Sequence, residues 1–201
     1  MNTLKLDLIK SHPAYYKAKR TPRIVELDTY KYLTISGQSA PEDPLFTGAI
    51  EAIYPVAFAI KFVFKEEDQD FVVPKMEGQW WVDDERPFEQ VPRNEWHWRI
   101  LMRMPQFVDS NTVEMVKEKL LKKGKTARIN DVGFQTLREG KCIQMLHIGS
   151  YEEEEKTIEQ ILQKMQEENL QMNGYHHEIY ISDPMRTPSW KLKTIIRYPV
   201  K

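Results

Sequence analysis

Hydrophobic positions recur at helical spacing after Asp43 and Pro44. An Asp followed by Pro is typical of a helix start, because the carboxylate caps backbone N–H groups and Pro needs no N–H in the first turn. The apolar residues at three- and four-residue steps are Phe46, Ala49, Ile50, Ile53, Ala57 and Ile60. The opposite side is also apolar, with Leu45, Ala52, Val56 and Ala59. The pattern predicts a helix that is covered on more than one face and kinked at Pro55.

Segments rich in β-branched and aromatic residues predict strands on both sides of that helix. Residues 24–37 contain repeated Tyr, Thr and Ile and end in Gly, which predicts a strand with Leu33 and Ile35 facing a core. The other elements predicted in this half are strands within 71–82 and 96–105 and a helix over 110–121.

The second half begins with signals for a turn. Residues 134–137 and 142–148 have strand-like composition, and Glu139 with Gly140 between them predicts a hairpin. A last strand is predicted over 190–198.

A capping box predicts the clearest helix of the chain. Ser150 is followed three residues later by Glu153, so each can satisfy a free N–H group of the other. The acidic run from Glu152 to Glu155 lies where carboxylates suit the helix dipole, so we interpret it as a cap and expect no chemistry from it. The predicted inner face consists of Tyr151, Ile158, Ile161, Leu162 and Met165.

Both halves have the element order strand, helix, strand, strand. The ten residues from Trp96 can be written over the ten from Trp190 with Trp, Arg and Pro in matching places. A similar overlay places Gln79 opposite Glu178 and Trp81 opposite Tyr180. Pockets favour the junction of duplicated units. The sequence therefore predicts an α+β fold of duplicated βαββ units with a pseudo-two-fold ligand groove between the halves.

The same reading gives a domain organisation. We expect an N-terminal arm over 1–22 and one domain over 23–201. Its two pseudo-repeats are predicted over 23–106 and 130–201, with a linker helix near 110–123.

The stretch from Tyr175 to Pro184 alternates polar residues with aromatic and β-branched ones, between turn signals, and so predicts a strand. Side chains two apart share a side of a strand. His176, Glu178 and Tyr180 should therefore lie on one face, and His177, Ile179 and Ile181 on the other. A carboxylate in mid-strand is costly unless it is paired or used. The alternative is a solvent-facing strand in which Glu178 is only hydrated.

Composition excludes several classes of protein. The formal net charge of −1 over 201 residues gives no basic footprint for nucleic acid or anionic lipid, so we expect neither as a partner. The first residues lack the apolar core of a signal peptide, which favours the cytoplasm. The single cysteine, Cys142, is expected to be a buried apolar residue. Because His176 and His177 point to opposite faces, they cannot chelate one ion together, and we expect no metal and no other cofactor.

Several motifs together resemble one known family. They are His-Ile-Gly-Ser-Tyr-Glu-Glu from His147, His-His-Glu-Ile-Tyr-Ile-Ser-Asp-Pro from His176, the final Lys-Leu-Lys-Thr-Ile-Ile-Arg-Tyr-Pro-Val, and Glu-Gly-Gln-Trp-Trp over 77–81. On these motifs the chain resembles the GyrI-like small-molecule-binding proteins over nearly its whole length beyond the first twenty residues.

The resemblance implies a SOUL/GyrI-like fold and a ligand groove. In the family, a carboxylate among aromatic rings receives flat, often cationic compounds. Stand-alone members of similar length include hydrolases that open the cyclopropane ring of DNA-alkylating natural products. This chain has no helix-turn-helix region, which argues against direct control of transcription.

Two hypotheses follow for the site. In the first, Glu178 is the general base of a detoxifying hydrolase and Tyr180 orients water or stabilises developing charge. In the second, the groove only binds or sequesters aromatic or cationic small molecules, and Glu178 is a counter-charge. The residues expected to line the groove in either case are Trp81, Gln79, Trp80, Tyr54, His147, Tyr151 and His176.

Overall fold

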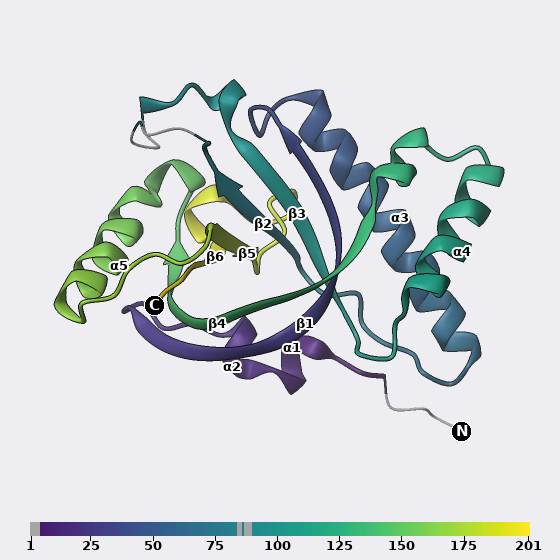
Figure 1. The fold of residues 1–201 in the computed structure, drawn as a ribbon, viewed down its shortest axis with the longest axis horizontal. Helices are drawn as coiled ribbons and strands as arrows, with labels where there is room; N and C mark the ends of the chain where they lie inside the picture. Colours follow the sequence, from purple (N-terminus) through teal and green to yellow (C-terminus); the bar gives the residue numbers. More distant parts are fainter. Residues whose placement is uncertain (1–4, 84–85, 87–89) are drawn as a thin grey trace. The chain divides into compact units, whose positions relative to one another are not determined.

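The computed structural model describes residues 5–83, 86 and 90–201. The fold is α+β, as predicted (Figure 1). In chain order the main elements are β1 (Arg23–Gln38), α3 (Pro44–Glu66), β2 (Met76–Trp81), β3 (His97–Met104), α4 (Ser110–Lys122), β4 (Gly133–Ile148), α5 (Glu155–Glu167), β5 (His176–Tyr180) and β6 (Lys193–Pro199). The order β1, α3, β2, β3 recurs as β4, α5, β5, β6, which is the repeated order that the sequence predicts.

The strands are hydrogen-bonded in the order β1-β3-β2-β5-β6-β4 around a closed barrel. The pairs β1–β3, β4–β6 and β5–β6 are antiparallel. In the last pair, Glu178 lies opposite Ile196 and Tyr180 opposite Thr194. This register determines which side chains of β6 can approach those of β5.

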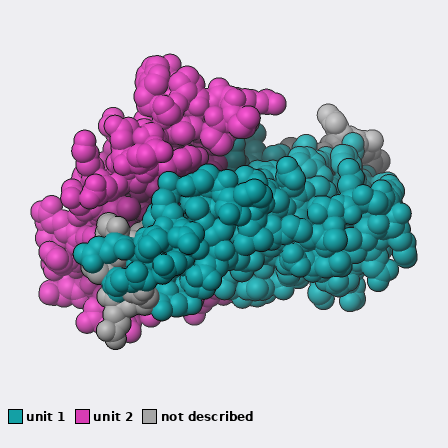
Figure 2. Space-filling model, turned by 90° about the horizontal axis from the view of Figure 1, so that it is seen from above, with its two compact units in different colours: residues 1–11, 30–76, 80–137 teal, residues 12–29, 77–79, 138–201 magenta. Residues whose placement is uncertain are grey.

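The chain divides into two compact units (Figure 2). Unit 1 consists of residues 1–11, 30–76 and 80–137, and unit 2 of residues 12–29, 77–79 and 138–201.

Helix α3 supplies much of the core of unit 1. Asp43 accepts a hydrogen bond from the Leu45 N–H at 2.7 Å and Pro44 opens the first turn, as predicted. The ring of Phe46 packs 5.2 Å from that of Trp80 and 5.1 Å from that of Trp98. Helix α4 packs beside α3 (Figure 1). Among the described residues α3 is also the one helix long and apolar enough to cross a membrane, and 44% of its apolar window is buried in the fold.

The described part of the segment predicted as an arm contains two short helices, α1 (Leu8–Ser11) and α2 (Pro13–Tyr16). Tyr15 and Tyr16 of α2 are buried in unit 2.

The hairpin predicted at Glu139 and Gly140 is wrong, because β4 is one continuous strand. Gly140 does adopt the left-handed backbone that a turn would use, with φ of 66°. However, the Glu139 side chain lies in the interior of unit 2, where Arg197 donates a hydrogen bond to it at 3.0 Å. A buried ion pair thus keeps in a strand two residues whose types favour a turn.

The final strand also begins later than predicted. Trp190 lies in a 3₁₀ turn, Ser189–Lys191, and its side chain is 65% exposed. Strand β6 starts at Lys193.

Candidate functional site

Strand β5 separates its side chains as the alternation predicts. His177 and Ile179 are buried on one face, while His176 and Glu178 are hydrogen-bonded to each other on the other. The side chain of Glu178 is 13% exposed. Glu178 is therefore not a merely hydrated residue on a solvent-facing strand.

The Glu178 carboxylate is held by an imidazole. His176 Nε2 lies 2.8 Å from Glu178 Oε1. A carboxylate can only accept, so Nε2 carries the donating proton. The other ring nitrogen, Nδ1, lies 2.6 Å from the hydroxyl of Tyr198 on β6. Tyr198 thus fixes the imidazole, and the imidazole fixes the carboxylate.

Glu154 is the nearest charged neighbour, and the sequence interpretation assigned it no chemistry. It follows a 3₁₀ turn, Tyr151–Glu153, at the start of α5, and is only 6% exposed. Its carboxyl group hydrogen-bonds the side chains of Glu178 and Thr194. Burial and the adjacent charge of Glu178 raise the pKa of Glu154 well above its usual range. The raised pKa favours the protonated form of the Glu154 carboxyl group, which can donate a hydrogen bond to Glu178.

Tyrosine rings complete the surroundings of Glu178. The rings of Tyr151 and Tyr180 meet edge to face with centroids 6.0 Å apart. Burial and the charge of Glu178 raise the pKa of Tyr151 to about 12, so its phenol stays neutral and able to donate. Thus Tyr151, Tyr180 and His176, all predicted from the sequence, gather with Glu178 in unit 2.

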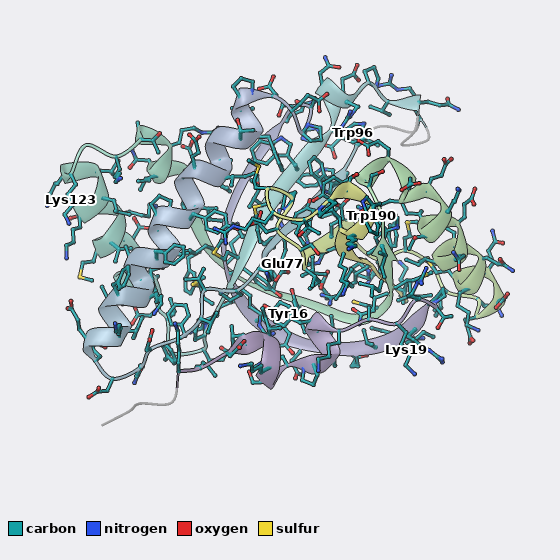
Figure 3. The ribbon with its side chains drawn as sticks, turned by 180° about the vertical axis from the view of Figure 1, so that it is seen from behind. Tyr16, Lys19, Glu77, Trp96, Lys123 and Trp190 are labelled. Atoms are coloured by element: carbon teal, nitrogen blue, oxygen red, sulfur yellow. The ribbon has the colours of Figure 1, made fainter. Side chains whose placement is uncertain are left out.

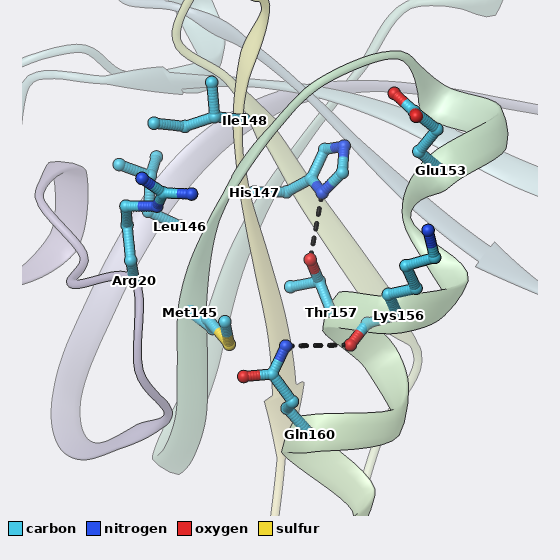
Figure 4. A pocket seen from close by; sticks show the side chains of 9 residues that line it. All are labelled: Arg20, Met145, Leu146, His147, Ile148, Glu153, Lys156, Thr157 and Gln160. Carbon is cyan, nitrogen blue, oxygen red and sulfur yellow. Dashed lines mark hydrogen bonds between the residues drawn. The ribbon is translucent and has the colours of Figure 1, made fainter.

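His147 has a structural task in unit 2. Its Nδ1 lies 2.9 Å from Thr157 Oγ1, and its Nε2 lies 2.9 Å from the carbonyl oxygen of Ser150. These bonds fix the start of α5 against β4. His147 also lines a cavity of about 550 Å³, which Arg20 and Lys156 line as well (Figure 4). A ligand that hydrogen-bonds His147 must displace one of the two existing bonds, and such contact stays a prediction.

The predicted aromatic residues of unit 1 have different surroundings. Trp80 is buried and packs edge to face against Trp96, so it contributes to the core. Trp81 is half-buried; its ring stacks on His97 with centroids 5.5 Å apart, and the guanidinium of Arg99 lies 5.8 Å from the ring centre. That these rings share a ligand groove with Glu178 stays a prediction.

The two other predicted groove residues, Tyr54 and Gln79, differ in burial. Tyr54, on α3, is partly buried against the core of unit 1. Gln79 belongs to unit 2 and is buried on β2. Their contact with ligand likewise stays a prediction.

The opposite face of β5 carries a buried network of charges. The ring nitrogens of His177 donate to Glu139 at 2.7 Å and to Glu77 at 3.0 Å. Tyr15 donates to Glu77, which is wholly buried and is labelled in Figure 3. Arg197 donates to Glu139 at 3.0 Å. The network thus joins α2, β2, β4, β5 and β6.

The charges of this network support one another. Burial opposes the charge on His177, but Glu139 and Glu77 outweigh it and raise the pKa of His177 to about 9. Burial likewise opposes the charge on Glu139, but His177 and Arg197 lower the pKa of Glu139 to about 2. At neutral pH both residues are charged, so ion pairs stabilise the face of β5 that lies opposite Glu178.

Comparison with known proteins identifies the family. The model of the GyrI-like small molecule binding domain matches residues 20–201. The chain belongs to the GyrI-like family. The matched region contains Glu178 and the residues described around it. No curated protein gives a sequence match.

Solved structures similar to this GyrI-like chain include hydrolases. One is a hydrolase from Listeria innocua with 31% identity and a TM-score of 0.90, for which 98% of this chain and 100% of the other are covered. A second hydrolase from the same organism has 32% identity, a TM-score of 0.87 and the same coverage. An uncharacterized conserved protein from Listeria innocua has 32% identity, a TM-score of 0.92 and again the same coverage. The solved structures that match nearly the full length of this chain thus include hydrolases.

The chemistry available at the candidate site follows from these groups. Glu178 offers a carboxylate that can attract a cation or accept a proton, next to flat rings on which a planar compound can stack. The Tyr151 phenol can donate a hydrogen bond, and so can the Glu154 carboxyl group in its protonated form. Donor atoms of Glu154, His176 and Glu178 also lie within 4.8 Å of one another, a spacing that suits a metal ion.

Sequence reasoning missed Glu154, Thr194 and Tyr198. The strand register provides the signal for two of them, because it places Thr194 opposite Tyr180 and brings Tyr198 to the same sheet. For Glu154 the only sequence signal was its place in an acidic run.

Proposed function

We propose that this GyrI-like protein binds flat, hydrophobic or cationic small molecules beside Glu178 and hydrolyses those that carry a strained cyclopropane ring. The observation that carries the proposal is the Glu178 carboxylate, held by His176 and Glu154 among tyrosine rings. The hydrolases among the structural relatives, at 31% and 32% identity over the full chain, support it.

The proposed reaction adds one molecule of water to the substrate. Glu178 accepts a proton from water while the water oxygen bonds to a ring carbon. The ring C–C bond breaks, and its electron pair moves into the conjugated carbonyl group of the substrate. A proton then reaches the carbonyl oxygen, which restores Glu178. Tyr180 is proposed to orient the water, and Tyr151, as a neutral donor, to stabilise charge on oxygen.

Such a reaction removes the group with which a DNA-alkylating toxin attacks DNA. We propose detoxification in the cytoplasm as its purpose. If Glu178 were only a counter-charge, the same residues would serve a second function, sequestration of cationic compounds without turnover; the nearby tyrosine rings favour this alternative for cations.

The variant Glu178→Gln tests the role of the base. It keeps the shape of the side chain, so binding of a neutral ligand should persist, whereas single-turnover ring opening at saturating drug should slow by about 10²- to 10⁴-fold. Product formation and neutral-ligand affinity are measured for both proteins. Equal rates would remove Glu178 from the chemistry. Weaker binding of cations alone, without turnover in either protein, would favour sequestration.

A further inference from the structure

Three side chains with metal-binding atoms converge in unit 2. Glu154 comes from the start of α5, and His176 and Glu178 come from β5. One donor atom from each lies within 4.8 Å of the others, and the closest printed pair, His176 Nε2 and Glu178 Oε1, is 2.8 Å apart. Ligands around a tetrahedral zinc ion, with bonds of about 2.1 Å, are separated by roughly 3.4 Å. Small side-chain movements therefore suffice to admit an ion.

An independent observation points to a missing partner in this cluster. Glu154 is 6% exposed, and its Oε1 atom is fully buried with no hydrogen-bond partner among the residues that the structure describes. A buried polar atom without a partner is costly, because no hydrogen bond compensates for the loss of its hydration. The other contacts of this carboxyl group are to Glu178 and Thr194, so the unsatisfied oxygen belongs to a group already directed at the cluster.

The surroundings resemble the outer shell of a metal site. An imidazole that ligates through one nitrogen usually holds the other in a hydrogen bond that sets the ring orientation. His176 does so, with Nδ1 2.6 Å from the Tyr198 hydroxyl. Thr194 hydrogen-bonds Glu154 in the same way. Two of the three ligands are thus oriented by residues of β6.

We propose that Glu154, His176 and Glu178 bind one divalent transition-metal ion, with Zn²⁺ as the best match. One imidazole and two carboxylates suit zinc, whereas Mg²⁺ prefers oxygen ligands in an octahedron and keeps its water. Three protein ligands leave a fourth position for water or another small ligand. Binding releases the proton of Glu154 and leaves the His176 proton on Nδ1, which faces Tyr198, so that the ion replaces the direct contact between two crowded carboxyl groups.

The inference is independent of the proposed function, since the ion needs no substrate in order to bind. It does have a consequence for that function. Because Glu178 is also the proposed general base, an ion bound to it blocks that role. Ring opening should therefore be fastest in the metal-free protein and should decrease as Zn²⁺ is added.

The direct test is calorimetric titration of the chelator-treated full chain with ZnCl₂, with MgCl₂ as comparison. We expect one Zn²⁺ per chain and no saturable binding of Mg²⁺. Glu154→Gln and His176→Gln should each weaken Zn²⁺ binding by at least about tenfold, and Tyr198→Phe, which keeps all three ligands, by about 10- to 100-fold. Glu152→Gln, an exposed carboxylate of the preceding turn, is the matched control and should bind as wild type does.

Circular dichroism establishes that each variant is folded, and Tyr198→Phe decides the matter if a ligand variant does not fold. The proposal fails if wild type shows no saturable Zn²⁺ binding. It also fails if Glu154→Gln and Tyr198→Phe bind Zn²⁺ as tightly as Glu152→Gln. Absence of ring opening by the metal-free wild type would instead count against the proposed hydrolase, and would leave the ion site standing.

Discussion

Glu77 and Glu178 are two carboxylates of unit 2 that differ in burial and in hydrogen-bond partners. Glu77 is wholly buried and receives hydrogen bonds from Tyr15 and His177, so it serves as a fixed counter-charge. Glu178 is held by His176 and by Glu154, and part of its side chain remains accessible. Only the second arrangement leaves a carboxylate available to a ligand.

Trp81 is the residue at which ligand contact and core packing are most readily separated. Its ring is half-buried, so Trp81→Ala should lower binding of a flat aromatic ligand by about 1 to 3 kcal/mol and change the melting temperature little. Trp98→Ala is the matched control, because Trp98 is fully buried and donates to Ser39 at 3.0 Å. That change should cost about 3 to 5 kcal/mol of stability.

Melting curves and ligand titrations on the two tryptophan variants give the comparison. If Trp81→Ala loses as much stability as Trp98→Ala, and binds ligand unchanged per folded molecule, then Trp81 belongs to the core.

Single elements show which features a sequence can predict. The faces of β5 and the start of α3 were confirmed because each depends on neighbours along the chain, through the two-residue period of a strand and the capping of a first turn. The sequence did not identify Glu154 as a site residue, because its partner Glu178 is distant in sequence. An acidic residue at a helix start is already explained by the helix dipole, so no further role was expected for it. The sequence therefore predicts the candidate site residues on β5, but not the residue that approaches them from the start of α5.

Gly140 is the reason why a hairpin was expected within β4, and its conformation can be tested by substitution. A left-handed conformation costs a residue with a side chain about 1 to 2 kcal/mol, so Gly140→Ala should destabilise the protein by about that amount. An added Cβ meets its nearest neighbour, Glu26, at an ordinary 3.7 Å, so the loss comes from the backbone. Gly140→Asn should cost less, because Asn tolerates this conformation. Urea unfolding of the two variants measures the difference, and equal losses would point to a steric cause.

On the scale of the folded chain, the buried ion pairs connect segments that are far apart in sequence. Arg197 donates to the carbonyl oxygen of Tyr15 at 2.7 Å and to Glu139 at 3.0 Å. A sequence with a net charge of −1 gives no sign of such a network, because paired charges cancel in the total. Removing one partner of a buried pair is strongly destabilising, since it leaves an uncompensated charge.

The network predicts how stability depends on pH. The pKa of His177 is raised from 6.5 to about 9, so its stabilising contribution is complete below pH 6.5 and is lost as the pH rises through about 9. The pKa of Glu139 is lowered from 4.5 to about 2, so its contribution is complete above pH 4.5 and is lost as the pH falls through about 2. The free energy of unfolding, measured by urea titration, should therefore decrease at both extremes.

His177→Gln isolates the alkaline limb of this profile. The variant should be less stable than wild type at pH 7, because Glu77 and Glu139 lose a cationic partner, and it should show a flatter profile between pH 7 and 10. An alkaline limb as steep as that of wild type would assign the loss of stability to another group.

The two faces of β5 also restrict how such a protein can diverge. A shift of one residue in the register of a strand sends every side chain to the opposite face. In β5 such a shift would bury Glu178 among the ion pairs and turn His177 toward the face that Glu178 occupies. Exchanges of side chains along β5 keep its two faces apart, whereas an inserted or deleted residue within the strand would disrupt the candidate site and the ionic interior together.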